Sequence, residues 1–125
     1  MAEAILAIDY RKRLATQAAG GASADAAGFI ALGDGGTTEA GVRSLIEYEN
    51  RLALFNEIHR VPLTRVEQID ALSTTAVGMA TNLAGKTISE AALLDRQGRV
   101  MAFKSFPAKA FGADETFDVS IRILF

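Results

Sequence analysis

The pattern that most constrains the fold is a strict alternation of residue types near the C-terminal end. Every odd-numbered residue from Phe117 to Ile123 is apolar, and the residues between them are Asp118, Ser120 and Arg122. Side chains of a β-strand point alternately to opposite faces of its sheet, so this period of two predicts a strand with one buried face. Such a strand is not stable alone, and the chain must therefore contain a sheet.

Two further apolar runs predict a β-hairpin. Residues 88–94 and 100–106 flank Asp95-Arg96-Gln97-Gly98, a turn with Asp first and Gly last, as a type I turn prefers. Pro107 is expected to end the second strand. A proline also interrupts one of the other extended segments and places it near a sheet edge. These other segments are expected at residues 29–32, 58–69 (with Pro62) and 74–81.

An N-terminal helix is expected over residues 3–18, which are rich in alanine, arginine, lysine and glutamine. Gly20-Gly21 ends this helix and opens a stretch of small residues that suits a linker. We therefore divide the chain into an N-terminal helix or arm, residues 1–21, and a single α+β domain, residues 22–125. An arm freed by the two glycines could pack on a neighbouring subunit.

A second helix is expected to follow the first short strand. Thr37 or Thr38 can cap its N-terminus, and apolar residues from Val42 to Phe55 recur at helical spacing. The predicted fold class is therefore α+β, with two N-terminal helices packed with a mainly antiparallel β-sheet and a final strand at the C-terminus.

Composition limits the classes of partner. Half of the 125 residues are hydrophobic, which is enough to build the core of one domain. The net charge of −2 is spread along the chain without a basic stripe, so no nucleic-acid partner is expected. The chain has no cysteine, which excludes disulfides and thiolate metal sites. No signal peptide and no apolar run of about 20 residues are present, so no membrane insertion is expected.

Few residues could carry covalent chemistry. His59 is the only histidine, and Glu57 would share its face of a strand, but neither a nucleophile nor a metal site is evident beside them. The Gly33-Asp34-Gly35-Gly36 turn could cradle a phosphate, yet the lysine and hydroxyl residue of a phosphate loop are missing. A tight turn that needs positive φ is the favoured interpretation. We expect no enzymatic activity, no cofactor and no metal.

Three segments carry a resemblance to a known family. They are residues 30–35 (IALGDG), 54–60 (LFNEIHR) and 88–102 (ISEAALLDRQGRVMA). In order and spacing they resemble the N-terminal domain of phage tail fibre proteins, the family of P2-like and Mu-like tails and of R-type pyocins. The resemblance extends over almost the whole chain. The chain departs from the family at Ala91-Ala92, where a glycine is usual, and at Leu94, which replaces an aromatic residue. Typical members of the family continue into a fibre shaft, whereas this sequence ends at Phe125, and both a stand-alone adaptor and the first part of a fibre are compatible with that.

The resemblance implies a structural virion protein of a tail baseplate, which docks a tail fibre as a stand-alone adaptor or as the first domain of a fibre. Its expected partners are baseplate and tail fibre proteins and further copies of itself, with a trimer as the family expectation. Its expected locations are the virion tail and, during assembly, the host bacterial cytoplasm. The expected interface residues are Asn56, Glu57, His59, Arg60, Glu90 and Asp95, and the expected turn residues are Gly33, Asp34, Gly35 and Gly98.

Two other classes stay open. A small ligand- or carbohydrate-binding module could use the sheet, with Gly35-Gly36 and the Asp95 turn at its rim. The absence of tryptophan and the presence of only two tyrosines leave few platforms for sugar stacking. A small hydrolase or isomerase would depend on His59 and scattered carboxylates.

Overall fold

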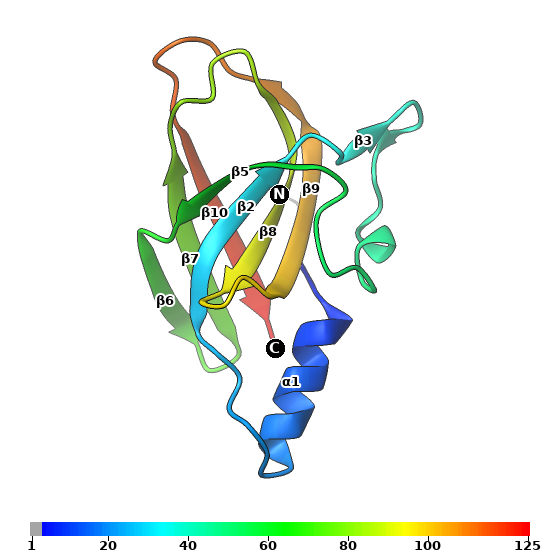
Figure 1. The fold of residues 1–125 in the computed structure, drawn as a ribbon, viewed down its shortest axis with the longest axis vertical. Coiled ribbons are helices and arrows are strands. Elements are labelled where there is room, and N and C mark those ends of the chain that lie inside the picture. Colours follow the sequence, from blue (N-terminus) through cyan, green and yellow to red (C-terminus); the bar gives the residue numbers. More distant parts are fainter. Residues whose placement is uncertain (1–3) are drawn as a thin grey trace.

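The computed structural model describes residues 4–125. Within these residues the chain forms three β-sheets and one α-helix (Figure 1). The elements in chain order are β1 (Ile5–Leu6), α1 (Ile8–Ala18), β2 (Ala27–Gly33), β3 (Thr37–Thr38), β4 (Gly41–Val42), the 3₁₀ turn η1 (Leu45–Glu47), β5 (Glu57–Pro62), β6 (Arg65–Asp70), β7 (Ser73–Ala80), β8 (Thr87–Asp95), β9 (Val100–Ala110) and β10 (Phe117–Leu124). No helix in residues 4–125 has the length and apolar character needed to cross a bilayer.

Two antiparallel sheets pack face to face as a sandwich. One has the strand order β1-β9-β8-β2-β5 and the other the order β10-β7-β6, and Figure 1 shows β10 and β7 behind β2 and β8. The layers approach closely at Gly78 of β7, where an added Cβ would lie 3.3 Å from Ile30 Cδ1 and 3.4 Å from Val61 Cγ2. Glycine at this position therefore lets β7 lie directly against β2 and β5.

The C-terminal alternation is confirmed as a strand that lines the sandwich core. β10 pairs with β7 along its whole length, from Phe117 opposite Ala80 to Leu124 opposite Ser73. Val119, Ile121 and Ile123 are buried, whereas the even-numbered residues between them are exposed. Burial of each such aliphatic side chain stabilises the fold by about 1.5–3 kcal/mol, so these three side chains fix β10 against the core.

The hairpin is confirmed, but its second strand is longer than predicted. β8 and β9 pair around the predicted turn, and Gly98 adopts the positive φ of +83° that favours glycine there. β9 continues past Pro107 to Ala110. The register shifts between Ile88 and Glu90, so a bulge in the β8–β9 pairing accommodates the missing N–H of the proline.

The prediction of an α+β fold with two N-terminal helices is wrong, because the described chain is mostly β and holds one helix. The second predicted helix is replaced by the short hairpin β3–β4, the single turn η1 and irregular chain. Gly41 has a φ of +112°, which a continuous helix does not allow. Ser44 and Glu47 form a capping box that closes only η1. Of the apolar residues at helical spacing, Ile46 and Leu52 are exposed.

The N-terminal helix is confirmed, but it begins later than predicted. Ile5 and Leu6 form β1 opposite Phe103 and Ala102 of β9, and residue 3 lies outside the described residues. The backbone N–H of Ala7 donates to the carbonyl of Met101, so strand pairing extends to the first residue before the helix. The buried residues of this segment are Ala7 and Tyr10.

Helix α1 lies against the body of the same chain. The Nη2 atom of Arg13 donates to the carbonyl of Val100 at 2.6 Å and lies 3.9 Å from a carboxylate oxygen of Asp95. The other terminal nitrogen of Arg13 pairs with Asp9 on the helix itself. One guanidinium therefore connects the helix to the turn between β8 and β9. The role of residues 1–21 as an arm that packs on a neighbouring subunit stays a prediction.

Replacing Arg13 by methionine should lower the free energy of unfolding by about 1–3 kcal/mol, because a largely buried charged hydrogen bond between α1 and β9 is lost. Urea denaturation measures this change. Arg11→Met is the matched control, since Arg11 is exposed on the same helix, and it should change stability by less than about 0.5 kcal/mol. Equal effects of the two substitutions would contradict an anchoring role for Arg13.

Candidate functional site

The densest polar cluster of the described chain surrounds Glu90, which is completely buried in the middle of the five-stranded sheet. Glu90 lies on β8, between Gly33 of β2 and Ser105 of β9. Its carboxylate accepts four hydrogen bonds from residues outside β8. The donors are the backbone N–H groups of Gly35 (3.0 Å) and Asn56 (2.9 Å) to Oε2, and the backbone N–H of Phe55 (3.1 Å) and the hydroxyl of Tyr48 (2.9 Å) to Oε1.

These four donors fix the conformation of residues 34–56, which we call the pinned loop. Gly35 lies near the start of this loop, Tyr48 in its middle, and Phe55 and Asn56 at its end, so one carboxylate holds all three parts. An ionised carboxylate offers about four acceptor positions, and each is occupied here. A buried charge that is fully hydrogen-bonded avoids the large cost of an unpaired one.

Glycines at the start of the pinned loop allow this close approach. A Cβ on Gly35 would lie 2.6 Å from the Cβ of Phe55, and one on Gly36 would lie 2.0 Å from the carbonyl oxygen of Ser89. Neither glycine has a positive φ. The prediction that glycine occurs here because the backbone needs a positive φ is therefore wrong for these two residues. Glycine is required because a side chain would not fit.

Tyr48 links the carboxylate to the aromatic part of the core. Its ring contacts Phe55 edge to face at 5.1 Å and Phe103 of β9 at 5.3 Å between centroids. Burial raises the pKa of the Tyr48 hydroxyl, and the adjacent negative charge of Glu90 raises it further. The hydroxyl therefore stays protonated and serves as a hydrogen-bond donor to Glu90 across the physiological pH range.

The outer side of the pinned loop is stiffened by two arginines stacked on one ring. The guanidinium carbons of Arg43 and Arg51 each lie 3.7 Å from the centroid of the Phe55 ring. Arg43 Nε donates to the carbonyl of Gly35 at 2.6 Å, and Arg51 Nε donates to the carbonyl of Ala53 at 2.9 Å. The stacking and these hydrogen bonds together restrict the surface of the loop.

The pinned loop exposes large apolar side chains. Val42 is 44% exposed, Ile46 is 64% exposed and Leu52 is 70% exposed. Single exposed apolar residues are common, but three on one rigid loop with Glu47 and Arg51 among them match the mixed composition of a protein interface.

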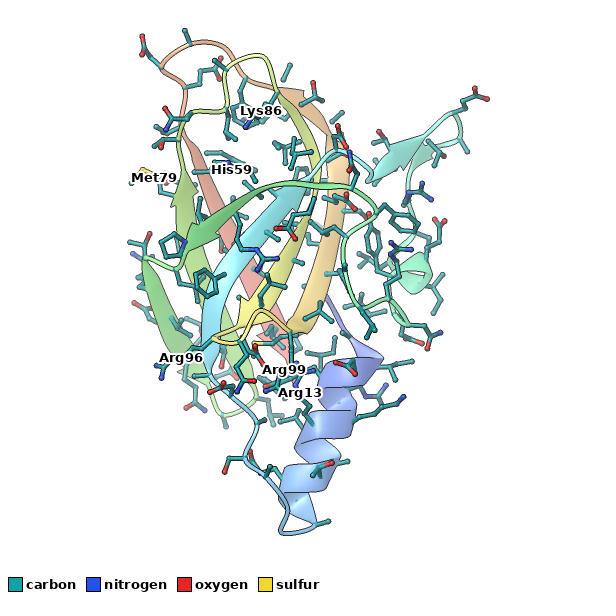
Figure 2. The ribbon with its side chains drawn as sticks, in the orientation of Figure 1. Arg13, His59, Met79, Lys86, Arg96 and Arg99 are labelled. Carbon is teal, nitrogen blue, oxygen red and sulfur yellow. The ribbon has the colours of Figure 1, made fainter. Side chains whose placement is uncertain are left out.

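Asp95 forms a second buried carboxylate cluster, at the other end of β8. Its Oδ1 accepts the backbone N–H groups of Gln97 and Arg99 at 2.9 Å, and its Oδ2 accepts Arg99 Nε at 2.9 Å. Burial of Asp95 raises its pKa, but the hydrogen bonds from Arg99 and Gln97 outweigh this effect and hold the pKa below its ordinary value. Figure 2 shows Arg13 and Arg99 close together at this turn.

The structure brings some of the predicted interface residues together and separates others. The side chain of Asn56 donates to Asp34 Oδ1 at 2.6 Å, beside the Glu90 cluster. Glu57 and Arg60 form an exposed ion pair with two hydrogen bonds of 2.8 and 2.9 Å. His59 is half-buried on β5 opposite Leu32. Figure 2 places it far from the labelled Arg13 and Arg99 at the Asp95 turn.

Several residues of the Glu90 cluster are not predicted by the sequence. The predicted second helix includes Tyr48, and no sequence pattern places Arg43 and Arg51 on the ring of Phe55. Ser89 Oγ accepts the N–H of Gly36 at 2.8 Å, and Ser105 Oγ donates to the carbonyl of Arg43 at 2.8 Å. The available signal was a single carboxylate inside an otherwise apolar strand, since such a charge must be met by donors from elsewhere.

No group of three or more histidine or acidic side chains in residues 4–125 is placed to hold a metal ion. Comparison of the chain with family models, curated proteins and solved structures gives no match.

Glu90→Gln should lower the free energy of unfolding by about 2–4 kcal/mol, because the new amide group places a donor against backbone N–H donors that then stay unpaired. Chemical denaturation measures the change. Glu39→Gln, at an exposed position of the same loop, is the matched control and should be near neutral. A Glu90→Gln protein as stable as the control would show that the carboxylate does not hold the loop.

Asp95→Asn should destabilise the protein by about 2 kcal/mol at pH 7 and by progressively less as the solution becomes acidic. The folded pKa of Asp95 lies below the ordinary 3.8, so its stabilisation is complete above that value and is lost as the pH falls through the folded pKa. Urea denaturation of both proteins from about pH 7 to about pH 2 tests this. A stability difference that stays constant over this range would contradict the assignment.

Proposed function

We propose that this chain is a protein-docking domain that binds its partner through the pinned loop. One observation carries the proposal. The buried carboxylate of Glu90 holds the loop through four hydrogen bonds, while Ile46 and Leu52 of the same loop are exposed. Association costs conformational entropy when loops must be ordered, and a loop already fixed in one shape avoids much of that cost. A rigid loop with exposed apolar side chains is therefore well suited to a specific protein partner.

The resemblance to tail fibre N-terminal domains supports a more specific proposal. Its three segments are far apart in the sequence, yet each supplies part of one cluster. Residues 30–35 supply Gly35, residues 54–60 supply the N–H groups of Phe55 and Asn56, and residues 88–102 supply Glu90. Segments that resemble a family in sequence and also form one structural unit are better support for a relationship than unconnected matches.

We therefore propose that the domain is a structural virion protein that docks a tail fibre to a tail baseplate. It acts by surface contact and not by covalent chemistry. Its partners in this proposal are baseplate and tail fibre proteins and further copies of itself, and the trimer expected from the family resemblance stays a prediction. The buried carboxylates support a structural role, because the oxygens of Glu90 and Asp95 accept hydrogen bonds from donors of the same chain.

The double substitution Ile46→Glu and Leu52→Glu should weaken binding to tail baseplate proteins at least about tenfold, because two charges replace the centre of an apolar contact. Pull-down and titration with purified baseplate proteins encoded in the same genome measure this effect. Leu72→Glu is the matched control, since Leu72 is 63% exposed on the hairpin between β6 and β7. The proposal fails if no baseplate or fibre protein binds, or if Leu72→Glu weakens binding equally.

A further inference from the structure

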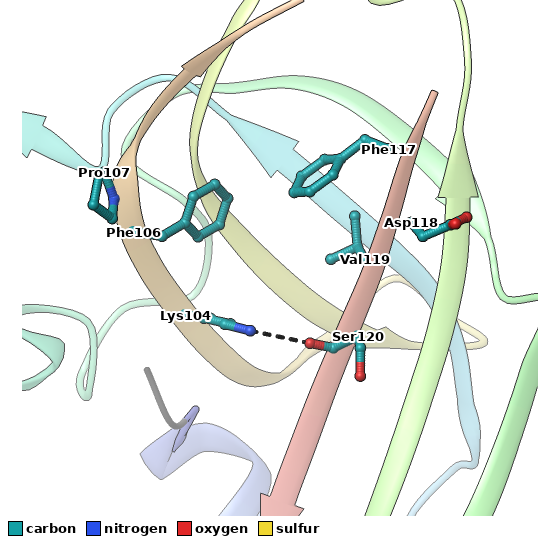
Figure 3. A pocket seen from close by; sticks show the side chains of 7 residues that line it. All are labelled: Lys104, Phe106, Pro107, Phe117, Asp118, Val119 and Ser120. Carbon is teal, nitrogen blue, oxygen red and sulfur yellow. Dashed lines mark hydrogen bonds between the residues drawn. The ribbon is translucent and has the colours of Figure 1, made fainter. Parts of the chain in front are cut away.

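A groove of about 360 Å³ runs along the free edge of β10 (Figure 3). All four consecutive residues from Phe117 to Ser120 line it, although their side chains point alternately to the two faces of the sheet. A groove on one face of the sheet would contact only every second residue, so contact with all four shows that this groove follows the strand edge. The opposite wall is β9, which contributes Lys104, Phe106 and Pro107.

The edge of β10 at this groove has no neighbouring strand in residues 4–125. β10 is the terminal strand of its sheet and pairs only with β7. The carbonyl of Ser120 points toward the groove, because it accepts a hydrogen bond from Lys104 Nζ at 3.2 Å. Backbone groups of alternate residues point to the same side of an antiparallel strand, so Asp118 and Arg122 also direct their N–H and C=O groups to this edge.

The inner side of the groove is apolar and aromatic. The rings of Phe106 and Phe117 approach from opposite walls with centroids 6.0 Å apart, as Figure 3 shows. Phe111 lies 5.2 Å from Phe117, and Val119 is buried beneath them. Apolar side chains of a bound molecule could therefore contact these rings from the open side.

Two lysines lie at the groove: Lys104 lines it, and Lys109 lies beside the lining ring of Phe117. Lys104 is half-buried, and burial lowers the pKa of its ammonium group. The Lys109 ammonium lies 5.3 Å from the Phe117 ring. Neither lysine forms an ion pair with any residue from 4 to 125, and Asp118 is the only acidic residue that lines the groove. An acidic group on a partner would complement this charge.

We propose that the free edge of β10 accepts an extended segment of a partner protein, which adds a fourth strand to the three-stranded sheet. The segment carries an acidic residue opposite Lys104 and apolar side chains at alternate positions beside Phe106 and Phe117. A strand fits better than an amphipathic lipid, because a strand can pair with the backbone N–H and C=O groups at this edge of β10, where it replaces Lys104 as the partner of the Ser120 carbonyl. It pairs with β10 and not with β9, where Pro107 has no N–H to donate.

This surface goes beyond docking through the pinned loop and does not depend on it. Selection from a random heptapeptide library, followed by fluorescence-polarisation titration of the enriched peptides, tests the proposal. We expect enrichment of peptides with alternating apolar residues and at least one Asp or Glu. The same titration with Ile46→Glu in the pinned loop should give unchanged affinity, which separates the two surfaces.

Two variants test the mode of binding. Ser120→Pro removes an N–H that faces the groove and not β7, so it should abolish peptide binding while the fold persists, whereas Ser120→Ala should bind like the wild type. Lys104→Met should weaken binding of acidic peptides about tenfold. Circular dichroism shows whether Ser120→Pro folds, and if it does not, Lys104→Met is the variant that tests the proposal. A titration with decanoate is run in parallel.

The proposal is supported if enriched peptides bind and lose affinity in Lys104→Met and in any folded Ser120→Pro protein. It is overturned if no peptide is enriched, if enriched peptides bind these variants as well as the wild type, or if decanoate binds the groove and peptides do not. The last result would assign the groove to an amphipathic carboxylate.

Discussion

A buried carboxylate on the central strand β8 determines how the largely irregular segment of residues 34–56 is arranged. An unpaired charge at the position of Glu90 would cost far more than a small domain can tolerate, and four donors must therefore converge on it. Three of these donors are backbone N–H groups that a helix or sheet ladder would otherwise have used. The requirement to satisfy Glu90 thus accounts for the lack of regular structure in much of residues 34–56, and it explains why this segment still has a defined shape.

Strand β8 carries a second buried carboxylate at its other end, and the two act on different parts of the chain. Glu90 holds the pinned loop, whereas Asp95 orders the β8–β9 turn and contacts Arg13 of α1. The hydrophobic core stabilises the two sheets, and these two polar clusters fix the attached segments in one orientation relative to the sheets.

Spacing in the sequence was enough to predict the β10 strand and the β8–β9 hairpin, but it led to the wrong fold class and did not reveal the site. The alternation in β10 and the Asp95–Gly98 turn depend only on residues close together in the sequence, so the spacing of residue types predicts them. The failed second helix had equally good spacing, from Val42 to Phe55, but the backbone N–H of its last residue, Phe55, bonds to Glu90 of β8, a partner 35 positions away. No local sequence pattern indicates that Glu90 competes with the helix for this N–H group. The isolated Glu90 within an apolar strand was visible, yet its donors could be identified only from the three-dimensional arrangement.

The two proposed surfaces are linked by neighbouring residues of one strand. On β9, Ser105 donates to the carbonyl of Arg43 in the pinned loop, and the adjacent Lys104 donates to the carbonyl of Ser120 at the groove. Successive side chains of a strand point to opposite faces, so β9 lies between the two surfaces and contacts both. An adaptor must hold two partners at a fixed angle, and a strand within a packed sheet changes shape much less than a hinge or linker does. Partners bound at these surfaces would therefore be held in one relative orientation.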